Sequence, residues 1–223
     1  MKKIVYLLLF VSTISYSQNA FSEYQFTAKR GTESAILALA DDMWGDAKFK
    51  SGGLNIESFH IGNNESTHRI VVFGDPANWG RIDSISAKAK FGLFKQELNN
   101  HIEDWKHSSS GNVISWVGEN DAHNYVQIFE FKASDPAAFK AAHDEIVSKM
   151  TPYRKGEVGF GSYEIAGFKG ATHWVAVTAE SWSDLILTRR EMKKITKPWK
   201  EYYENRGNVE HVRNYTAEIV KRY

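Results

Sequence analysis

The segment ATHWVAVTAESW, from Ala171 to Trp182, decides the fold because an earlier segment repeats its order of residue types. That earlier segment is STHRIVVFGDPANW, from Ser66 to Trp79. Each contains a small residue, Thr and His, then an apolar run, then an acidic residue, and then a Trp where a helical pattern begins. An internal repeat of this kind indicates that one duplicated unit builds the chain.

The first half shows the order strand, helix, strand, strand, helix, strand. Alternating apolar and polar residues predict its strands, and apolar residues three and four apart predict its helices. A turn at Gly62-Asn63-Asn64 joins the second and third strands as a hairpin. The expected elements are strands over residues 23–29, 56–61, 69–73 and 113–117, and helices from 33 to about 45 and from 82 to 105.

The second half repeats this order at a nearly constant spacing. Residues 127–132 match residues 24–29 at an offset of 103, and His173 follows His68 by 105. The final helical region is shorter than its counterpart, and Pro198 interrupts it. We expect this proline to end one helix and to begin a short next one, since proline is tolerated only in the first turn.

This order of elements is the ferredoxin-like βαββαβ motif, an α+β unit in which both helices cover one face of an antiparallel sheet. Two such units can cover each other's bare faces, and the third strand of each is apolar at almost every position. We therefore expect two tandem repeats packed sheet to sheet, over residues 18–119 and 120–223. Over about residues 23–219 the chain resembles the dimeric alpha-beta barrel superfamily in its fused, two-repeat form.

That resemblance implies a pocket between the sheet and the helices of one repeat. The superfamily includes antibiotic-biosynthesis-type monooxygenases that oxidise aromatic substrates without a cofactor, haem-degrading enzymes, chlorite dismutases, dye-decolourising peroxidases and small isomerases. The leading hypothesis is a small-ligand protein, monooxygenase-like and cofactor-independent, that acts on an aromatic or quinone-like molecule in the second repeat. A non-catalytic structural or interaction domain is one alternative, and a haem-binding protein is another. Assembly of the chain into a homo-oligomer is a further possibility that the sequence leaves open.

His143 is the first candidate for a catalytic residue. On the helix predicted from Pro136 to Met150, it falls inside the apolar stripe, four residues after Phe139. Its counterpart in the first repeat is Ala40. A histidine at an inward position in one repeat alone is what divergence of one pocket toward function would produce. It could act as a base or, as the haem-binding relatives imply, as an axial ligand; the alternative is a core histidine whose nitrogens neighbours satisfy.

His173, on the third strand of the second repeat, is the next catalytic candidate. His68 occupies the equivalent place, so the alternative is a structural role at the start of each strand. His211 on the last strand is a candidate ligand-binding residue. Histidine is a suitable residue type for a metal ligand, so the three histidines of this half could in principle form a metal site. Their spacing matches no recognised metal motif, and we expect no metal site.

Trp174, Tyr163 and Glu130 complete the set of candidate ligand-binding residues. Strand alternation places Trp174 on the opposite face of its strand from His173. The two aromatic residues would form flat pocket walls if they face the helices, and would otherwise be core residues. Glu130 could act as a general base, or it could pair with Arg213.

Composition narrows the class of protein. The 223 residues include no cysteine, which excludes disulfides and thiolate chemistry. Lys2 and Lys3, the apolar run 4–11 and the small and polar residues up to Ser17 predict a signal peptide cleaved after Ser17, and hence a secreted or periplasmic protein. That run is too short to span a membrane. Without Lys2 and Lys3 the formal charge falls from +1 to −1. The mature chain therefore has no excess of basic residues that would indicate nucleic acid as a partner.

One basic run lies on the final helical region of the second repeat. We expect it to be a solvated helix face, because anion binding would need the charges to converge, which a single helix surface does not provide. The run consists of Arg189, Arg190, Lys193, Lys194, Lys197 and Lys200.

Overall fold

The computed structural model describes residues 19–82, 84–118 and 123–223. The expected signal peptide with its cleavage site after Ser17, and the expected boundary between the repeats at residues 119 and 120, lie outside these ranges. Among the described residues, no helix is long and apolar enough to cross a membrane.

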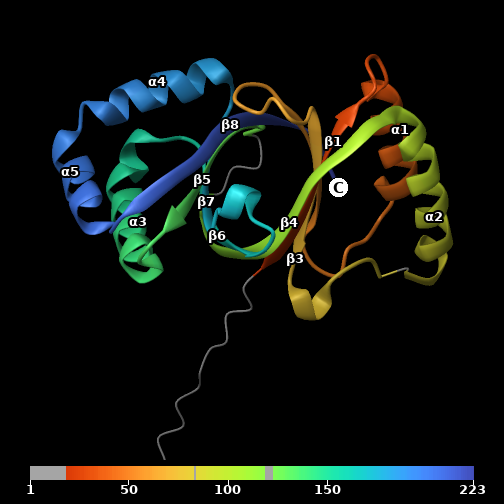
Figure 1. Cartoon of the computed structure of the whole chain (residues 1–223), viewed down its shortest axis with the longest axis horizontal. Coiled ribbons are helices and arrows are strands. Elements are labelled where there is room, and N and C mark those ends of the chain that lie inside the picture. Colours follow the sequence, from red (N-terminus) through yellow and green to blue (C-terminus); the bar gives the residue numbers. More distant parts are fainter. Residues whose placement is uncertain (1–18, 83, 119–122) are drawn as a thin grey trace, which may run out of the picture.

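Eight antiparallel strands of the described chain close into a barrel in the order β1-β3-β2-β8-β5-β7-β6-β4 (Figure 1). The two sheets join along both edges, where β2 pairs with β8 and β4 pairs with β6. The α+β class and the fused barrel are therefore confirmed. The strands are β1 (Ala20–Ala28), β2 (Gly53–Phe59), β3 (His68–Gly74), β4 (Ile102–Val117), β5 (Tyr125–Ala133), β6 (Val158–Ile165), β7 (His173–Ala179) and β8 (Val209–Arg222).

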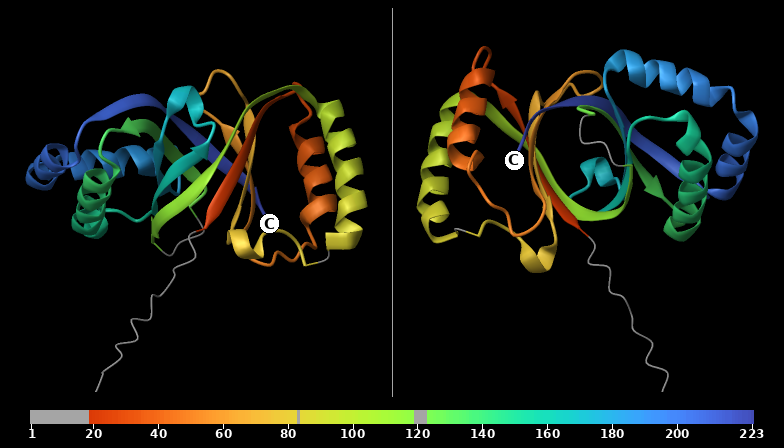
Figure 2. Two further views of the ribbon diagram at one scale, coloured as in Figure 1. Left: turned by 60° about the horizontal axis from the view of Figure 1, so that its bottom comes forward. Right: turned by 180° about the vertical axis from the view of Figure 1, so that it is seen from behind.

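The α-helices lie outside the barrel in two groups on opposite sides (Figures 1 and 2). The first repeat carries α1 (Glu33–Trp44) and α2 (Ser84–His101). The second carries α3 (Pro136–Met150), α4 (Trp182–Lys193) and α5 (Thr196–Asn205). Short 3-10 helices are η1 (Pro76–Asn78), η2 (Thr151–Tyr153) and η3 (Phe168–Gly170).

The junction of α2 and β4 differs from the sequence prediction. The expected helix to residue 105 ends at His101, and β4 begins at the next residue, so the predicted strand 113–117 is only its final part. Ile102 packs into the same core as Phe94 and Leu98 of α2, so the apolar spacing of the helix continues past its last residue. Trp105 instead pairs with Phe26 of β1, at 5.5 Å between ring centroids. Pairing along the barrel outweighs the local pattern here.

The repeat register of the first strands also differs from the expected offset of 103. Phe26 pairs with His68, and Phe131 pairs with His173, so β1 and β5 correspond at an offset of 105. A shift of two residues keeps every side chain on the same face of the sheet. The expected inward and outward faces of these strands are therefore unaffected.

The final helical region is divided as predicted. α4 ends at Lys193, α5 begins at Thr196, and Pro198 lies in the first turn of α5, where a missing N–H costs no helical hydrogen bond. Ser181 caps the start of α4, because its Oγ accepts a hydrogen bond from the Asp184 N–H at 3.2 Å.

The described residues form three larger apolar clusters, which the barrel wall separates. One lies between the sheet and α1 and α2, one between the sheet and α3 and α5, and one inside the barrel. A smaller cluster of Tyr125, Ala179 and Leu185 lies beside α4. β7 contributes to both sides, because Trp174 and Ala176 point into the barrel while Val175 packs on the helix side. This burial on both faces explains its nearly unbroken apolar sequence.

Candidate ligand cavity of the second repeat

A cavity of about 510 Å³ lies between the barrel wall of the second repeat and its three helices. Its apolar walls come from the outward faces of β5 and β7 and the inward face of α3. They include Phe129, Phe131, Phe139, Ile146, Val147, Val175 and Val177. A cavity of this size and lining suits a small organic ligand.

His143 lines this cavity from the middle of α3. Asp135 caps the helix by accepting a hydrogen bond from the Ala138 N–H at 3.0 Å, which sets the register that turns His143 inward. Only 4% of the residue is exposed. Its ring stacks on Phe139 at 6.0 Å and packs against Phe160 at 5.0 Å between centroids.

The electrostatic surroundings keep His143 neutral. Burial lowers the pKa of the imidazole to about 4; nearby Asp144 opposes this effect, while Lys140 and Arg154 add to it. None of the described residues forms a hydrogen bond with either ring nitrogen. The alternative of a core histidine requires neighbours that bind its ring nitrogens, and the described residues provide none.

Positive charges converge on the same cavity from three elements. Arg154 follows η2, Arg189 and Lys193 lie on α4, and Lys200 and Arg206 lie on or directly after α5. Arg189 of the basic run therefore turns inward, contrary to the expectation of a solvated face, while Lys193 and Lys200 line the cavity but remain exposed. Sequence reasoning missed Arg154 and Arg206 because each is an isolated residue that the tertiary fold alone brings to the site.

His211 of β8 also lines the cavity, as its assignment to ligand binding requires. His173 shares the helix-facing side of β7 with Val175 but lies behind Phe160, at 5.7 Å between ring centroids. Its Nδ1 lies 2.8 Å from Thr172 Oγ1.

The first repeat reproduces the surroundings of His173. His68 Nδ1 lies 2.9 Å from Thr67 Oγ1, and His68 stacks on Phe26 as His173 stacks on Phe131. The two threonine hydroxyls accept hydrogen bonds from the equivalent amides of Ala28 and Ala133. This symmetry supports the structural interpretation of the repeated Thr-His pair.

Trp174, Tyr163 and Glu130 lie inside the barrel, on the other side of the sheet from the cavity. Glu130 is fully buried and accepts hydrogen bonds from Arg213 Nε at 2.6 Å and Tyr163 Oη at 2.9 Å. The predicted pairing of Glu130 with Arg213 is confirmed. Trp174 packs edge-on against Phe21 at 5.5 Å. The structure therefore does not bring these three residues together with His143.

A second buried ion network, which sequence reasoning missed, joins the two halves inside the barrel. Arg69 lies 2.7 Å from Glu23 and 2.7 Å from Glu57, and its Nη1 donates to Tyr215 Oη at 3.0 Å. Tyr215 donates in turn to Glu130 at 3.2 Å. Burial raises the pKa of Glu23, but the Arg69 charge and the hydrogen bonds outweigh it, so that pKa is lowered.

No group of three His, Cys, Asp or Glu residues within the described ranges is placed to hold a metal ion. His143, His173 and His211 therefore do not assemble into the three-histidine site considered from the sequence.

No protein-family model and no curated protein sequence matches the chain. Among solved structures, a proposed monooxygenase from Fusobacterium nucleatum subsp. nucleatum matches with a TM-score of 0.61 and 14% identity, covering 93% of this chain and 94% of that chain. An anthrone oxidase-like protein matches with a TM-score of 0.56 and 10% identity, covering 94% of both. A variant chlorite dismutase from Candidatus Nitrospira defluvii, in complex with cyanide, matches with a TM-score of 0.53 and 14% identity, covering 91% of both.

The closed barrel and these matches define the class: the chain has the dimeric α/β-barrel fold in its fused, two-repeat form. The resemblance inferred from the repeat is confirmed at the level of the fold. At identities this low the likeness establishes the fold and leaves the activity to the site.

Proposed function

We propose that the second-repeat cavity binds an aromatic or quinone-like molecule and that the protein oxidises it as a cofactor-independent, monooxygenase-like enzyme. The observation that carries this proposal is a neutral, buried imidazole without a hydrogen-bond partner among the described residues, lining an apolar cavity of about 510 Å³. The similarity to a proposed monooxygenase and to an anthrone oxidase-like protein supports the same reaction class.

His143 acts as the general base in this proposal. It removes a proton from an acidic CH₂ group of the bound aromatic molecule, and the resulting carbanion transfers electrons to dioxygen. The carbon gains one oxygen atom as a carbonyl, and the second oxygen leaves as water with the two protons of the original CH₂ group. A pKa of about 4 keeps the imidazole unprotonated at neutral pH. The negative charge that develops on the substrate stabilises the imidazolium as it forms.

The test has two stages. Thermal shift of the purified protein against aromatic metabolites and quinones finds ligands, because a molecule that binds only the folded state raises Tm. Oxygen consumption with each ligand then measures turnover in the wild type and in His143→Gln. His60→Gln is the matched control, since that side chain is 40% exposed and pairs with Glu218.

We expect turnover to fall at least 100-fold in His143→Gln, which is the usual contribution of a general base, and to be unchanged in His60→Gln. A protein that no compound stabilises is instead a structural or interaction domain. Ligand binding and turnover that survive His143→Gln would remove His143 from the site.

Haem binding is the second candidate function. The neutral imidazole of His143 is the form that ligates iron, and the cavity carries cationic side chains of the kind that pair with haem carboxylates, so the residue types fit this group. Bound haem would supply one-electron and oxygen chemistry. Titration with haemin decides the matter: a Soret shift in the wild type that His143→Ala abolishes establishes ligation. An unchanged spectrum in both proteins leaves the cofactor-free reaction.

We also propose that the protein works outside the cytoplasm, on the strength of the signal-peptide pattern that ends at Ser17. Expression of the full chain in a bacterial host, followed by mass spectrometry of the periplasmic fraction, tests it. The expected product begins at Gln18, and an uncleaved cytoplasmic product contradicts the proposal.

A further inference from the structure

We propose that the ligand of the second-repeat cavity is an organic anion whose carboxylate is held by Arg154 and Arg189, with Lys193 beside them, while its apolar body lies against the barrel wall. The inference deepens the proposed function of the same cavity and rests on it.

The charges that line the cavity are all of one sign. Five cationic side chains line it and no carboxylate does. Arg154, Arg189 and Lys193 form no ion pair with any carboxylate of the described chain. On the outside of the same region, Lys194 pairs with Glu191 at 2.6 Å and Lys149 pairs with Glu145 at 2.6 Å. The cavity therefore has an excess of positive charge, whereas these lysines on the outer surface are paired with carboxylates.

Arg154 and Arg189 line two hollows in common. Both line the cavity and a small recess beside it, together with Val177 and Leu185; Asp184 lines the recess but not the cavity. Lys193 follows Arg189 by four residues on α4, so it lies on the same side of the helix one turn later. An anion between the two arginines would thus meet three cations from two separate elements.

Neutral groups orient both arginines without cancelling their charge. Arg189 donates from Nη1 to the amide oxygen of Gln127 at 2.9 Å and lies over the Phe129 ring at 5.7 Å. Arg154 donates from Nη1 to the carbonyls of Gly156 at 2.7 Å and Val117 at 3.2 Å. A planar guanidinium held in this way is preorganised for a carboxylate, and less affinity is lost to ordering it.

Arg154 also has an unused donor. Its Nε–H is buried and has no hydrogen-bond partner, which is costly for a charged group. Burial lowers the pKa of this guanidinium. A ligand carboxylate would supply both the missing acceptor and the missing negative charge.

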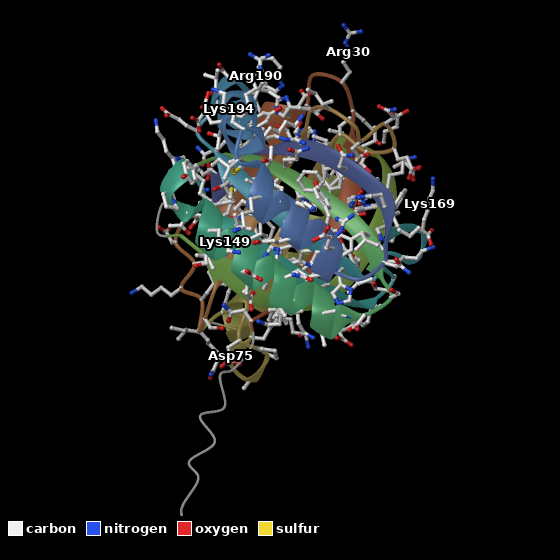
Figure 3. The ribbon with its side chains drawn as sticks, turned by 90° about the vertical axis from the view of Figure 1, so that its left-hand side faces the viewer. Arg30, Asp75, Lys149, Lys169, Arg190 and Lys194 are labelled. Atoms are coloured by element: carbon white, nitrogen blue, oxygen red, sulfur yellow. The ribbon has the colours of Figure 1, made fainter. Side chains whose placement is uncertain are left out.

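The orientation of α4 separates binding cations from solvated ones. Arg189 is half-buried and lines the cavity, whereas its neighbour Arg190 is exposed and does not. Figure 3 shows Arg190 and Lys194 at the outer edge of the molecule. Adjacent arginines on one helix therefore provide a matched pair of test and control positions.

The experiment compares 2-naphthoate with 2-naphthamide by isothermal titration calorimetry at low and high salt. The two probes share the same flat body and differ in charge. We expect naphthoate to bind the wild type about tenfold more tightly or better, because a charge-assisted hydrogen bond contributes about 1.5 kcal/mol or more. Arg189→Gln should lose this preference and leave naphthamide binding unchanged. Arg190→Gln should bind both probes as the wild type does.

Each outcome decides a separate point. Equal affinities of the two probes for the wild type overturn the anion inference and leave the proposed aromatic ligand standing. An equal loss in Arg190→Gln and Arg189→Gln overturns it too, since the effect is then one of overall charge. Binding of neither probe overturns the proposed aromatic ligand together with this inference. Arg154→Lys provides a second variant that retains the charge but not the fork geometry, and it should weaken naphthoate alone.

Discussion

The pKa of His143 makes a quantitative prediction about stability. In the unfolded chain this imidazole titrates near pH 6.5, whereas burial lowers its pKa in the folded protein to about 4. Between these values the unfolded chain binds a proton that the folded protein does not, so acid destabilises the fold. Above pH 6.5 both states are neutral at this position and the effect vanishes.

The magnitude follows from linkage. Near pH 5.2 the two states differ by about 0.9 proton at His143, which gives a slope of about 1.2 kcal/mol per pH unit. Summed from pH 7 to pH 4, the contribution is about 3 kcal/mol. His143→Gln removes this titration and keeps a polar side chain of similar length.

Urea unfolding of the two proteins at half-unit steps from pH 7 to pH 4 measures the effect. The free energy of unfolding of the wild type should fall more steeply than that of His143→Gln, so that the wild-type value minus the variant value decreases by about 3 kcal/mol from pH 7 to pH 4. His68 and His173, whose pKa values burial also lowers, contribute to both proteins and cancel in the difference. Parallel curves would mean that His143 titrates normally in the folded protein, and the argument for a buried neutral base would fail.

Two further predictions concern the barrel itself. Arg69→Met leaves two buried carboxylates without their partner and should lower the free energy of unfolding by about 3–5 kcal/mol. Lys149→Met at a surface ion pair should have a much smaller effect, because solvent screens that pair. Urea unfolding at pH 7 measures both, and equal costs would contradict the account of the network. Thr67→Val and Thr172→Val each remove the acceptor of one strand amide and should cost a similar amount, about 1 kcal/mol; a large cost in one repeat alone would show that the repeated Thr-His pair has diverged in role.

The internal repeat made the architecture predictable. Two copies of one element order restrict the fold to units that can cover each other's sheets, and the inward position of His143 followed from helical spacing alone. Strand alternation also separated Trp174 from His173 correctly. It could not say which face of the strand meets the cavity, because both faces of β7 are buried. Trp174, Tyr163 and Glu130 were candidates for that reason, and the structure places them inside the barrel.

Local sequence patterns could not predict where β4 starts or that cations from separate segments line one cavity. Ile102 continues the apolar spacing of α2 while already belonging to the barrel, and only the pairing with β1 reveals the change. Arg154 and Arg189 are 35 residues apart and line the same recess because η2 and α4 are in contact. Local patterns in a single sequence do not reveal that two such distant residues line one site.

The contrast between the two repeats explains why the site lies in the second. In the first repeat Ala40 is buried in a core where Trp44 of α1 packs against Phe94 of α2, at 4.5 Å between ring centroids. α2 is one continuous helix of 18 residues, so it can cover the sheet along its length. In the second repeat the corresponding region is divided into α4 and α5, and the cavity lies beneath them. A fold that needs both repeats to close its barrel can therefore keep one outer face packed for stability and leave the other open for a ligand. The change from Ala40 to His143 at equivalent positions occurs on the face that is open.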